Sequence, residues 1–293
     1  MEIRQIQYFL SIAKTGSFSA AADEQFISQS SLSKKIISLE EELGVILFDR
    51  SKLHICLTET GEVFLEHAQK LDTAYRTMIA DLERSKSNVD ILSIAAIPVM
   101  PQYGITTQIA QFRDQFPNIK FSLEEIEDVN ILPALDEYRI DLAFKRHNYL
   151  DLDKYECLEF YRDKLLVVVS KKNRHAIRTS ISLDQLSGDT FIMFDKVTTL
   201  HTLIMEECRK AGFTPTIFHS SLRYESIFGL TGLDVGLSLM PVKVYEYYQH
   251  PDVLAIPLVE DIECNIVLVY LKNRKLPQAA STFIKFIERN AII

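Results

Sequence analysis

The apolar residues in the first sixth of the chain repeat with a helical period in two short blocks. The first helix is expected over about Ser19–Phe26, with Ser17 or Ser19 as its N-cap. After a short break, the second is expected to begin near Gln29 and to end at Gly44, a residue suited to a left-handed C-cap. Two short helices joined by a tight turn form a helix-turn-helix, which lays its second helix in the major groove of DNA.

The second predicted helix has one apolar and one polar face. Its apolar residues are spaced i, i+4, i+7 and i+11 and are expected to face the domain core: Leu32, Ile36, Leu39 and Leu43. The opposite face is expected to read DNA through Gln29, Ser30, Ser33, Lys34 and Ile37. Glutamine can pair with an adenine edge, lysine with phosphate or guanine, and isoleucine with a thymine methyl group. Each residue alone would fit an ordinary solvated face, but together with the turn they favour a DNA interface.

The segment after Gly44 alternates between apolar and polar residues, which predicts a short strand of a β-wing. Its two sides would carry Leu53, Ile55 and Leu57 on one and Lys52, His54 and Cys56 on the other. Arg50 and Lys52, near the wing tip, are expected to follow the DNA backbone or to enter the minor groove. Ser17, at the start of the first helix, completes the predicted DNA-binding residues.

Residues 1–62 resemble the winged helix-turn-helix of the LysR-type transcriptional regulators. The resemblance is carried by the continuous stretch QIQYFLSIAKTGSFSAAADEQFISQSSLSKKIISLEEELGVILFDR and by LTETG after it. It implies base and phosphate contacts at Gln29, Ser30, Ser33, Lys34, Arg50 and Lys52. Two features depart from the family: the wing is less basic than in many members, and Ile37 is apolar where a polar, basic or small residue is usual.

Residues 58–86 form the longest predicted helix. Its apolar residues are separated by 4, 3, 4, 3 and 4 positions, the heptad spacing of a coiled coil: Phe64, Ala68, Leu71, Tyr75, Met78 and Leu82. Because one helix cannot bury such a seam alone, pairing of two copies is favoured over burial within one chain. The segment resembles the family's linker helix, which pairs two DNA-binding domains. A pair of chains would imply two related half-sites on the DNA.

The remaining 205 or so residues alternate between apolar runs and helical patterns, which predicts an α/β fold with mainly parallel, doubly wound sheets. The apolar runs lie at 91–97, 119–126, 140–144, 165–170, 191–194, 235–240 and 266–271. The stretches FRDQFPNIKFSL, YRIDLAF, AGFTP and GLTGLDVGLSLMP resemble the family's two-lobed regulatory domain, which is similar to periplasmic (Rossmann-like) binding proteins. The resemblance therefore covers essentially the whole chain.

By this resemblance, residues 1–58 form the winged helix-turn-helix, with the helix-turn-helix at about 18–37, and residues 59–88 form the linker helix and hinge. Residues 89–293 form the effector-binding domain, with lobe one at 91–161 plus 266–293 and lobe two at 162–265. The effector cleft is expected to include Pro98, Val99, Asp128, Arg146, Thr198, Thr199, His219 and Ser220. Arg146 and His219 would contact an acidic effector; the alternative for Arg146 is a structural pair with a nearby acidic residue.

Charge refines the prediction for the DNA-binding part. The chain has 32 basic and 40 acidic residues, a net charge of -8. Residues 1–58 hold seven acidic residues against six basic ones: Arg4, Lys14, Lys34, Lys35, Arg50 and Lys52. A general binder of polyanions would be basic, so useful affinity is expected only from an oligomer with several recognition helices engaged together.

Other functional classes find little support. The chain contains no GxGxxG, GxxxxGK, HExxH or GxSxG motif, and its cysteines have no CxxC spacing. An enzyme and a solute-binding protein remain the alternatives, and a redox sensor would need Cys157 close to Cys264 at the lobe junction. No metal or cofactor is indicated. The polar start MEIRQIQYF and the absence of a long apolar run predict a cytoplasmic protein that does not enter membranes.

These patterns together predict a transcriptional regulator, not an enzyme. Its expected partners are double-stranded promoter DNA, an unknown small-molecule effector, further copies of the chain in a dimer or tetramer, and RNA polymerase. The effector would change the relative orientation of the lobes and hence DNA spacing or bending.

Overall fold

A computed structural model describes residues 1–49, 55–86 and 90–290. The chain forms two compact units, Met1–Lys86 and Ser87–Ile293. The predicted wing residues Arg50, Lys52, Leu53 and His54 and the last two residues of the predicted hinge, 87 and 88, lie outside the described residues. In the described chain, no helix combines the length and the apolar character that a membrane span requires.

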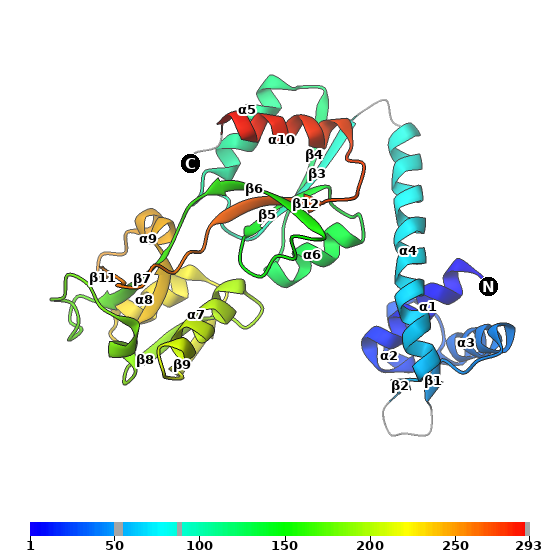
Figure 1. Ribbon diagram of the computed structural model, residues 1–293, viewed down its shortest axis with the longest axis horizontal. Helices are drawn as coiled ribbons and strands as arrows, with labels where there is room; N and C mark the ends of the chain where they lie inside the picture. The colour runs from blue at the N-terminus through cyan, green and yellow to red at the C-terminus, as the bar shows by residue number, and fades with distance from the viewer. Residues whose placement is uncertain (50–54, 87–89, 291–293) are drawn as a thin grey trace. The chain divides into compact units, whose positions relative to one another are not determined.

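The first unit consists of four helices and a two-stranded ribbon (Figure 1). Its elements are α1 (Ile3–Thr15), α2 (Phe18–Glu24), α3 (Gln29–Leu43), β1 (Phe48–Asp49), β2 (Cys56–Leu57) and α4 (Glu59–Lys86). Ser17 caps α2 and Ser28 caps α3, each accepting a hydrogen bond from a backbone N–H in the first turn. Gly44 ends α3 in the left-handed conformation, as its sequence context indicates.

An aromatic cluster holds this unit together. The ring of Phe9 in α1 lies 5.0 Å from that of Phe48 in β1 and 4.8 Å from that of Phe64 in α4. On α3, the predicted apolar stripe is buried at Leu32, Ile36 and Leu39. The prediction is wrong for Leu43, which is 37% exposed because the helix ends there, beyond the elements that cover the stripe.

The ribbon is fixed to α3 and α4 by polar contacts. The Glu40 carboxylate accepts hydrogen bonds from the backbone N–H groups of Leu47 (2.8 Å) and Phe48 (3.2 Å). At the start of α4, the Thr58 hydroxyl donates to the carbonyl of Ile46 at 2.6 Å. One turn later Gly61 packs against the Leu47 carbonyl so closely that an added Cβ would lie 2.1 Å from its oxygen. Only glycine fits this contact without a backbone shift.

Helix α4 changes character along its length. Near its N-terminus, Ala68 is buried and Phe64 packs against the core of the first unit. Further along, the heptad residues Leu71, Met78 and Leu82 are 46%, 49% and 51% exposed. The first part of the seam is therefore used within the chain, whereas the rest faces solvent in the single chain.

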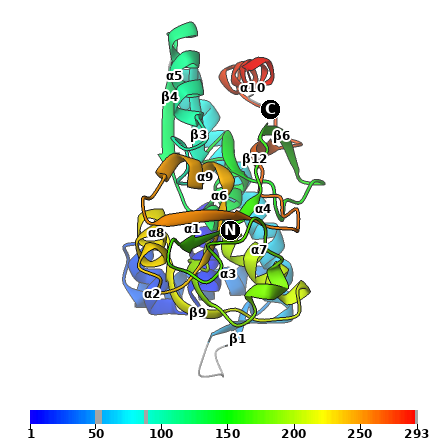
Figure 2. The ribbon, with the colours of Figure 1, turned by 90° about the vertical axis from the view of Figure 1, so that its left-hand side faces the viewer.

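The second unit contains two lobes. The first lobe is a five-stranded sheet in the order β4-β3-β5-β12-β6, with α5 and α10 packed together (Figures 1 and 2). Its strands are β3 (Asp90–Ala96), β4 (Ile119–Glu125), β5 (Leu142–Arg146), β6 (Tyr155–Tyr161) and β12 (Ile266–Leu271), and its helices are α5 (Ile105–Gln115), α6 (Asp128–Asp136) and α10 (Gln278–Asn290). The pairs of β3 with β4 and β5 are parallel, and those of β12 with β5 and β6 are antiparallel.

The second lobe has an antiparallel three-stranded sheet, β10-β7-β11, and a parallel pair, β8-β9. An isolated bridge between Phe191 and Leu237 links the two groups. The elements are β7 (Leu165–Ser170), η1 (Leu183–Leu186), β8 (Thr190–Phe194), α7 (Thr199–Lys210), β9 (Thr216–Ser221), α8 (Tyr224–Gly232), β10 (Ser238–Pro241), α9 (Val242–Tyr248) and β11 (Val253–Pro257).

The predicted α/β class is confirmed, but the expectation of mainly parallel sheets is wrong. The chain crosses between the lobes before β7 and again before β12. Strand β7 pairs antiparallel with β11, and β12 pairs antiparallel with β6. Three strands that the apolar runs do not predict are β6, β9 and β11. In β6 exposed polar residues interrupt the apolar ones, and β9 has a short apolar stretch, Ile217 and Phe218, that is exposed and followed by polar residues.

We predict that Gly61→Ala destabilises the first unit by about 1–3 kcal/mol, because the methyl group would overlap the Leu47 carbonyl. Amide hydrogen exchange followed by mass spectrometry should show faster exchange throughout Met1–Lys86. Gly188→Ala is the matched control, since its Cβ would meet no atom within 4 Å. Unchanged exchange in Gly61→Ala would contradict the predicted contact.

Candidate functional site

The N-terminal half of α3 presents the predicted DNA-reading residues. Gln29, Ser30 and Lys34 are exposed, and Ser33 is half-buried on the same face. Lys34 forms no ion pair with any residue that the structure describes, so its ammonium group is available to a phosphate. The free N–H groups of the first turn add partial positive charge at this end of the helix. The surface can therefore accept an anion and offers hydrogen-bonding groups to base edges.

Two apolar residues lie at or near this surface. Phe26, in the turn between α2 and α3, is 95% exposed and adopts a left-handed backbone with φ of 54°. Ile37 is exposed on α3, as its position in the helix predicts. Sequence reasoning placed Phe26 at the end of the first helix and did not identify it as a surface residue. The Ser17 hydroxyl oxygen accepts a hydrogen bond from the Ala20 N–H at 3.3 Å, so this residue has a structural role as a cap.

Several acidic groups of the first unit are engaged by neighbouring residues. Glu24 accepts hydrogen bonds from Lys14 (2.8 Å) and from Ser11 (2.5 Å), which lower the pKa of its carboxyl group. Glu42 pairs with the N-terminal ammonium group, and Glu2 lies 3.9 Å from the Lys35 ammonium. Because each pair also engages a cation, the net charge of the unit is unchanged, and Lys14 and Lys35 are less available to DNA than Lys34.

The second unit contains a cavity between its lobes, which we call the Arg146 cavity, with about 430 Å³ of empty space including its opening to solvent. Its lining comprises Ile97, Pro98, Val99, Glu127, Asp128, Arg146, Phe194, Thr198, Thr199, Leu200, Leu222 and Tyr224. Six of the eight predicted effector residues are in this lining. His219 and Ser220 are not: they lie within β9, and the chain reaches the cavity only at Leu222, after the strand has ended.

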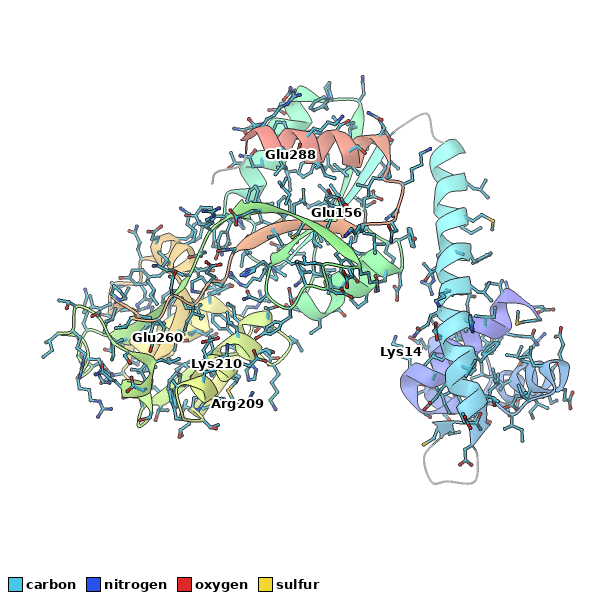
Figure 3. The ribbon with its side chains drawn as sticks, viewed as in Figure 1. Lys14, Glu156, Arg209, Lys210, Glu260 and Glu288 are labelled. Carbon is cyan, nitrogen blue, oxygen red and sulfur yellow. The ribbon has the colours of Figure 1, made fainter. Side chains whose placement is uncertain are left out.

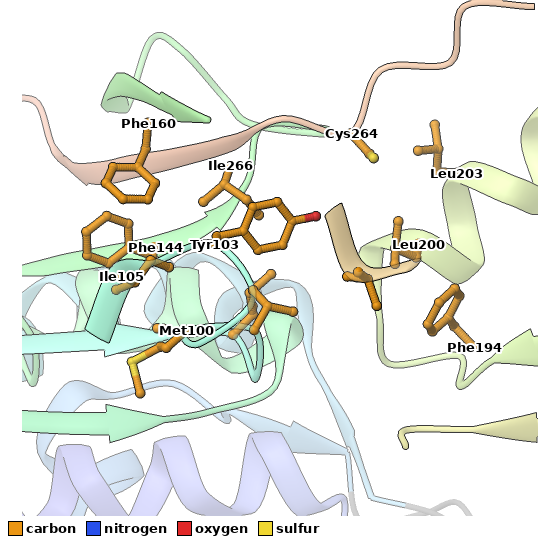
Figure 4. Packing of buried hydrophobic residues seen from close by; sticks show 14 of the residues in the cluster. Met100, Tyr103, Ile105, Phe144, Phe160, Phe194, Leu200, Leu203, Cys264 and Ile266 are labelled. Atoms are coloured by element: carbon orange, nitrogen blue, oxygen red, sulfur yellow. The ribbon is translucent and has the colours of Figure 1, made fainter. Parts of the chain in front are cut away.

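Arg146 is almost completely buried at the end of β5. Its guanidinium donates to the Cys264 carbonyl at 2.6 Å and to the Tyr103 hydroxyl at 3.3–3.4 Å, and it interacts electrostatically with Tyr224. The alternative prediction, a structural pair between Arg146 and a nearby acidic residue, is therefore wrong: the direct partners are a backbone carbonyl and a tyrosine hydroxyl. In the view of Figure 4 the Tyr103 ring lies between the side chain of Phe144 and that of Leu200.

Asp163 is the nearest acidic member of this network. Its carboxylate accepts hydrogen bonds from the Tyr103 hydroxyl (2.6 Å), the Lys164 N–H (2.8 Å) and the Lys243 N–H (3.3 Å). Burial raises its pKa, although these donors and the Arg146 charge oppose the shift. Asp163 lies between β6 and β7, where the chain crosses from one lobe to the other, so the network joins Arg146 to the crossover.

Asp128 connects the two lobes on another side of the cavity. Its carboxylate accepts a hydrogen bond from the Thr199 hydroxyl, at the start of α7, and lies 3.6 Å from the Lys145 ammonium. Burial lowers the pKa of Lys145, although Asp128 opposes this effect. The Asp128 Oδ1 atom is buried and faces the Lys145 ammonium at 3.6 Å, beyond the usual length of a hydrogen bond, so it accepts no hydrogen bond from the described residues. A ligand that carries a donor group would complete this site.

The other polar lining residues have mixed roles. The Thr198 hydroxyl accepts from the His201 N–H at 3.2 Å and donates to the Asp195 carbonyl at 2.8 Å, so it fixes the start of α7. Burial raises the pKa of Glu127, which the nearby Arg223 charge opposes and the charges of Asp195 and Asp128 reinforce. Glu127, Leu222 and Tyr224 also line the cavity and are not among the effector residues predicted from the sequence.

The redox alternative does not fit the geometry. Cys157 pairs in register with Val269, five residues beyond Cys264 along β12, or roughly 16 Å of extended chain. Cys157 and Cys264 are both free thiols, and burial raises the pKa of each. Within the described ranges, no group of three or more histidine, cysteine, aspartate or glutamate residues is arranged to bind a metal ion.

Comparison with known proteins identifies both units. Residues 3–62 match the family described as bacterial regulatory helix-turn-helix protein, lysR family, and residues 86–291 match the LysR substrate binding domain. The uncharacterised HTH-type transcriptional regulator YwbI of Bacillus subtilis is 28% identical over 97% of this chain and 95% of its own length.

Solved structures share the arrangement. HinK, a LysR family transcriptional regulator from Pseudomonas aeruginosa, is 26% identical, with a TM-score of 0.61 over 99% of this chain and 98% of its own. Full-length CbnR in complex with its target DNA is 23% identical, with a TM-score of 0.60 over 99% of this chain and 100% of its own. The chain therefore belongs to the LysR family, as a DNA-binding transcriptional regulator with an effector-binding domain and not an enzyme.

Proposed function

We propose that this regulator controls promoters through a small-molecule effector bound in the Arg146 cavity. The observation that carries the proposal is the lining of the cavity, which takes residues from both lobes and includes a buried acceptor, Asp128 Oδ1, that has the Lys145 ammonium at 3.6 Å but no hydrogen bond of ordinary length. An effector with a hydrogen-bond donor and an apolar part would pair with Asp128 and contact Ile97, Val99 and Leu200.

Such an effector would change the balance between lobe orientations. The hydrogen bond between Thr199 and Asp128 crosses the cleft, and a ligand group next to it would compete with it or reinforce it. A ligand shifts a conformational equilibrium only as far as its affinity differs between the two states. Because the lining spans both lobes, the affinity of a bound molecule depends directly on their orientation.

We further propose that the chain acts as a dimer, or as a dimer of dimers, through α4. The exposed seam Leu71, Met78 and Leu82 would pair with the same seam of a second copy. Two recognition helices would then engage DNA together, which offsets the near-neutral charge of one unit. A change in lobe orientation would alter the spacing of these helices and so the access of RNA polymerase to the promoter. The regulator would act in the cytoplasm, where its promoter DNA lies.

We predict that Lys34→Gln weakens DNA binding and lowers the slope of log affinity against log salt by about two for a dimer, because one phosphate contact is lost from each of the two copies. Fluorescence anisotropy with an intergenic fragment retained by the purified protein measures both quantities. Lys70→Gln removes the same charge from α4, where Lys70 pairs with Glu66, and should change neither. An unchanged salt slope in Lys34→Gln would exclude the proposed phosphate contact.

We predict that Leu71→Glu combined with Met78→Glu dissociates the oligomer, since four like charges would face one another across the paired seam. Sedimentation velocity at micromolar concentration should show the mass falling to that of one chain. Gln69→Glu adds a charge on another face of α4 and should leave the mass unchanged. The pairing is refuted if the double variant sediments like the unmodified protein.

We predict that Leu222→Trp blocks the Arg146 cavity, because Leu222 is 43% exposed and lines it. A small-molecule panel is screened for compounds that raise the thermal unfolding midpoint of the unmodified protein, as a ligand of the folded state must. Leu222→Trp should bind such a compound at least tenfold more weakly. Leu233→Trp, at a 77% exposed position outside the lining, should bind it normally. Equal affinity in both variants would place the effector elsewhere.

A further inference from the structure

A second cavity lies between the lobes of the second unit and shares no lining residue with the Arg146 cavity. We call it the α7 groove; it has about 840 Å³ of empty space, including its open mouth. The first lobe contributes His147, Asn148, Tyr149, Leu150, Leu152 and Cys157, and α7 of the second lobe contributes Leu203, Glu206, Glu207 and Lys210. Figure 3 labels Lys210 on α7.

Two of the lining residues have polar atoms that the chain leaves unsatisfied. His147 Nδ1 and Asn148 Oδ1 are buried, and neither has a hydrogen-bond partner in the part of the chain that the structure describes. The orientation of the Asn148 amide is fixed by its other end, because Nδ2 donates to the Glu263 carbonyl at 3.2 Å. Oδ1 is therefore an acceptor that requires an external donor.

The charges of the groove favour a cation. Glu206 accepts a hydrogen bond of 2.5 Å from the Tyr149 hydroxyl, a neutral donor, so its negative charge is not neutralised by this contact. Glu207 is paired with Lys210 at 2.7 Å, and the Lys210 charge also interacts with Glu206. The two carboxylates and the one ammonium group of the lining together carry a net charge of −1. Leu150, Leu152 and Leu203 provide apolar surface beside it.

From these contacts we infer that the α7 groove binds a small organic ammonium ion with an apolar tail. The ammonium group would donate to the Glu206 carboxylate and to Asn148 Oδ1, and the tail would cover the leucines. Since Tyr149 and Glu206 already join the two lobes, an ion placed between them would hold the lobes together at this edge. The site is separate from the proposed effector cavity and does not depend on it.

The test uses three probes of equal length at pH 7.4: hexylammonium, hexan-1-ol and hexanoate. Titration calorimetry on the full chain should show saturable binding of hexylammonium, at least tenfold tighter than hexanol, and no binding of hexanoate. Glu206→Gln, which keeps an acceptor for Tyr149, should weaken hexylammonium binding about tenfold or more. Glu246→Gln removes an exposed carboxylate elsewhere, on α9, and should have no effect.

The cysteines locate the bound probe. Cys157 lines the groove and is exposed, whereas the exposed Cys56 belongs to the other unit. Hexylammonium should slow alkylation of Cys157 by N-ethylmaleimide and leave Cys56 unchanged, and Leu222→Trp should not alter this protection. The inference is overturned if no saturable binding occurs, if hexanoate binds equally, or if Glu206→Gln binds like Glu246→Gln. It is equally overturned if Leu222→Trp abolishes the binding, since the probe would then occupy the Arg146 cavity.

Discussion

The buried guanidinium of Arg146 constrains the whole second unit. Removing such an ion from water costs several kcal/mol unless hydrogen bonds compensate for the lost hydration. Its partners come from three separate segments: Tyr103 before α5, Cys264 at the second crossover and Tyr224 at the start of α8. These segments must therefore converge on the end of β5. Asp163 extends the arrangement to the first crossover through Tyr103, so the junction between the lobes is built around one charge.

Around this fixed junction, the lobes meet through side-chain contacts that a ligand can replace. Thr199 with Asp128 and Tyr149 with Glu206 are hydrogen bonds across the cleft, and each borders a cavity. Both bonds have a carboxylate acceptor, and a hydrogen bond to a charged group contributes about 1.5–3 kcal/mol. This is less than the several kcal/mol at stake for the buried guanidinium, so the contacts beside the cavities are the weaker part of the junction.

The first unit uses one helix for two tasks. The start of α4 completes the core through Phe64 and Ala68, and Gly61 brings it against the ribbon. Beyond these contacts the same heptad continues with exposed leucine and methionine side chains. Because a helix of 28 residues is a continuous element, the seam and the reading helix α3 are held by one framework. Pairing at the seam would thus determine how two reading helices are presented to DNA.

The sequence by itself determined those features that depend only on residues close to one another in the chain. The limits of α3 follow from the Ser28 cap and from Gly44, and its buried stripe at Leu32, Ile36 and Leu39 follows from helical periodicity. The resemblance supplied six residues that the fold gathers in one cavity. Only the tertiary structure decided that Arg146 is satisfied by a carbonyl and by a tyrosine hydroxyl group, that Cys157 and Cys264 are separate, and that His219 and Ser220 lie outside the cavity. These outcomes depend on strand register and on crossovers between distant segments, and neither leaves a periodic signal in the sequence.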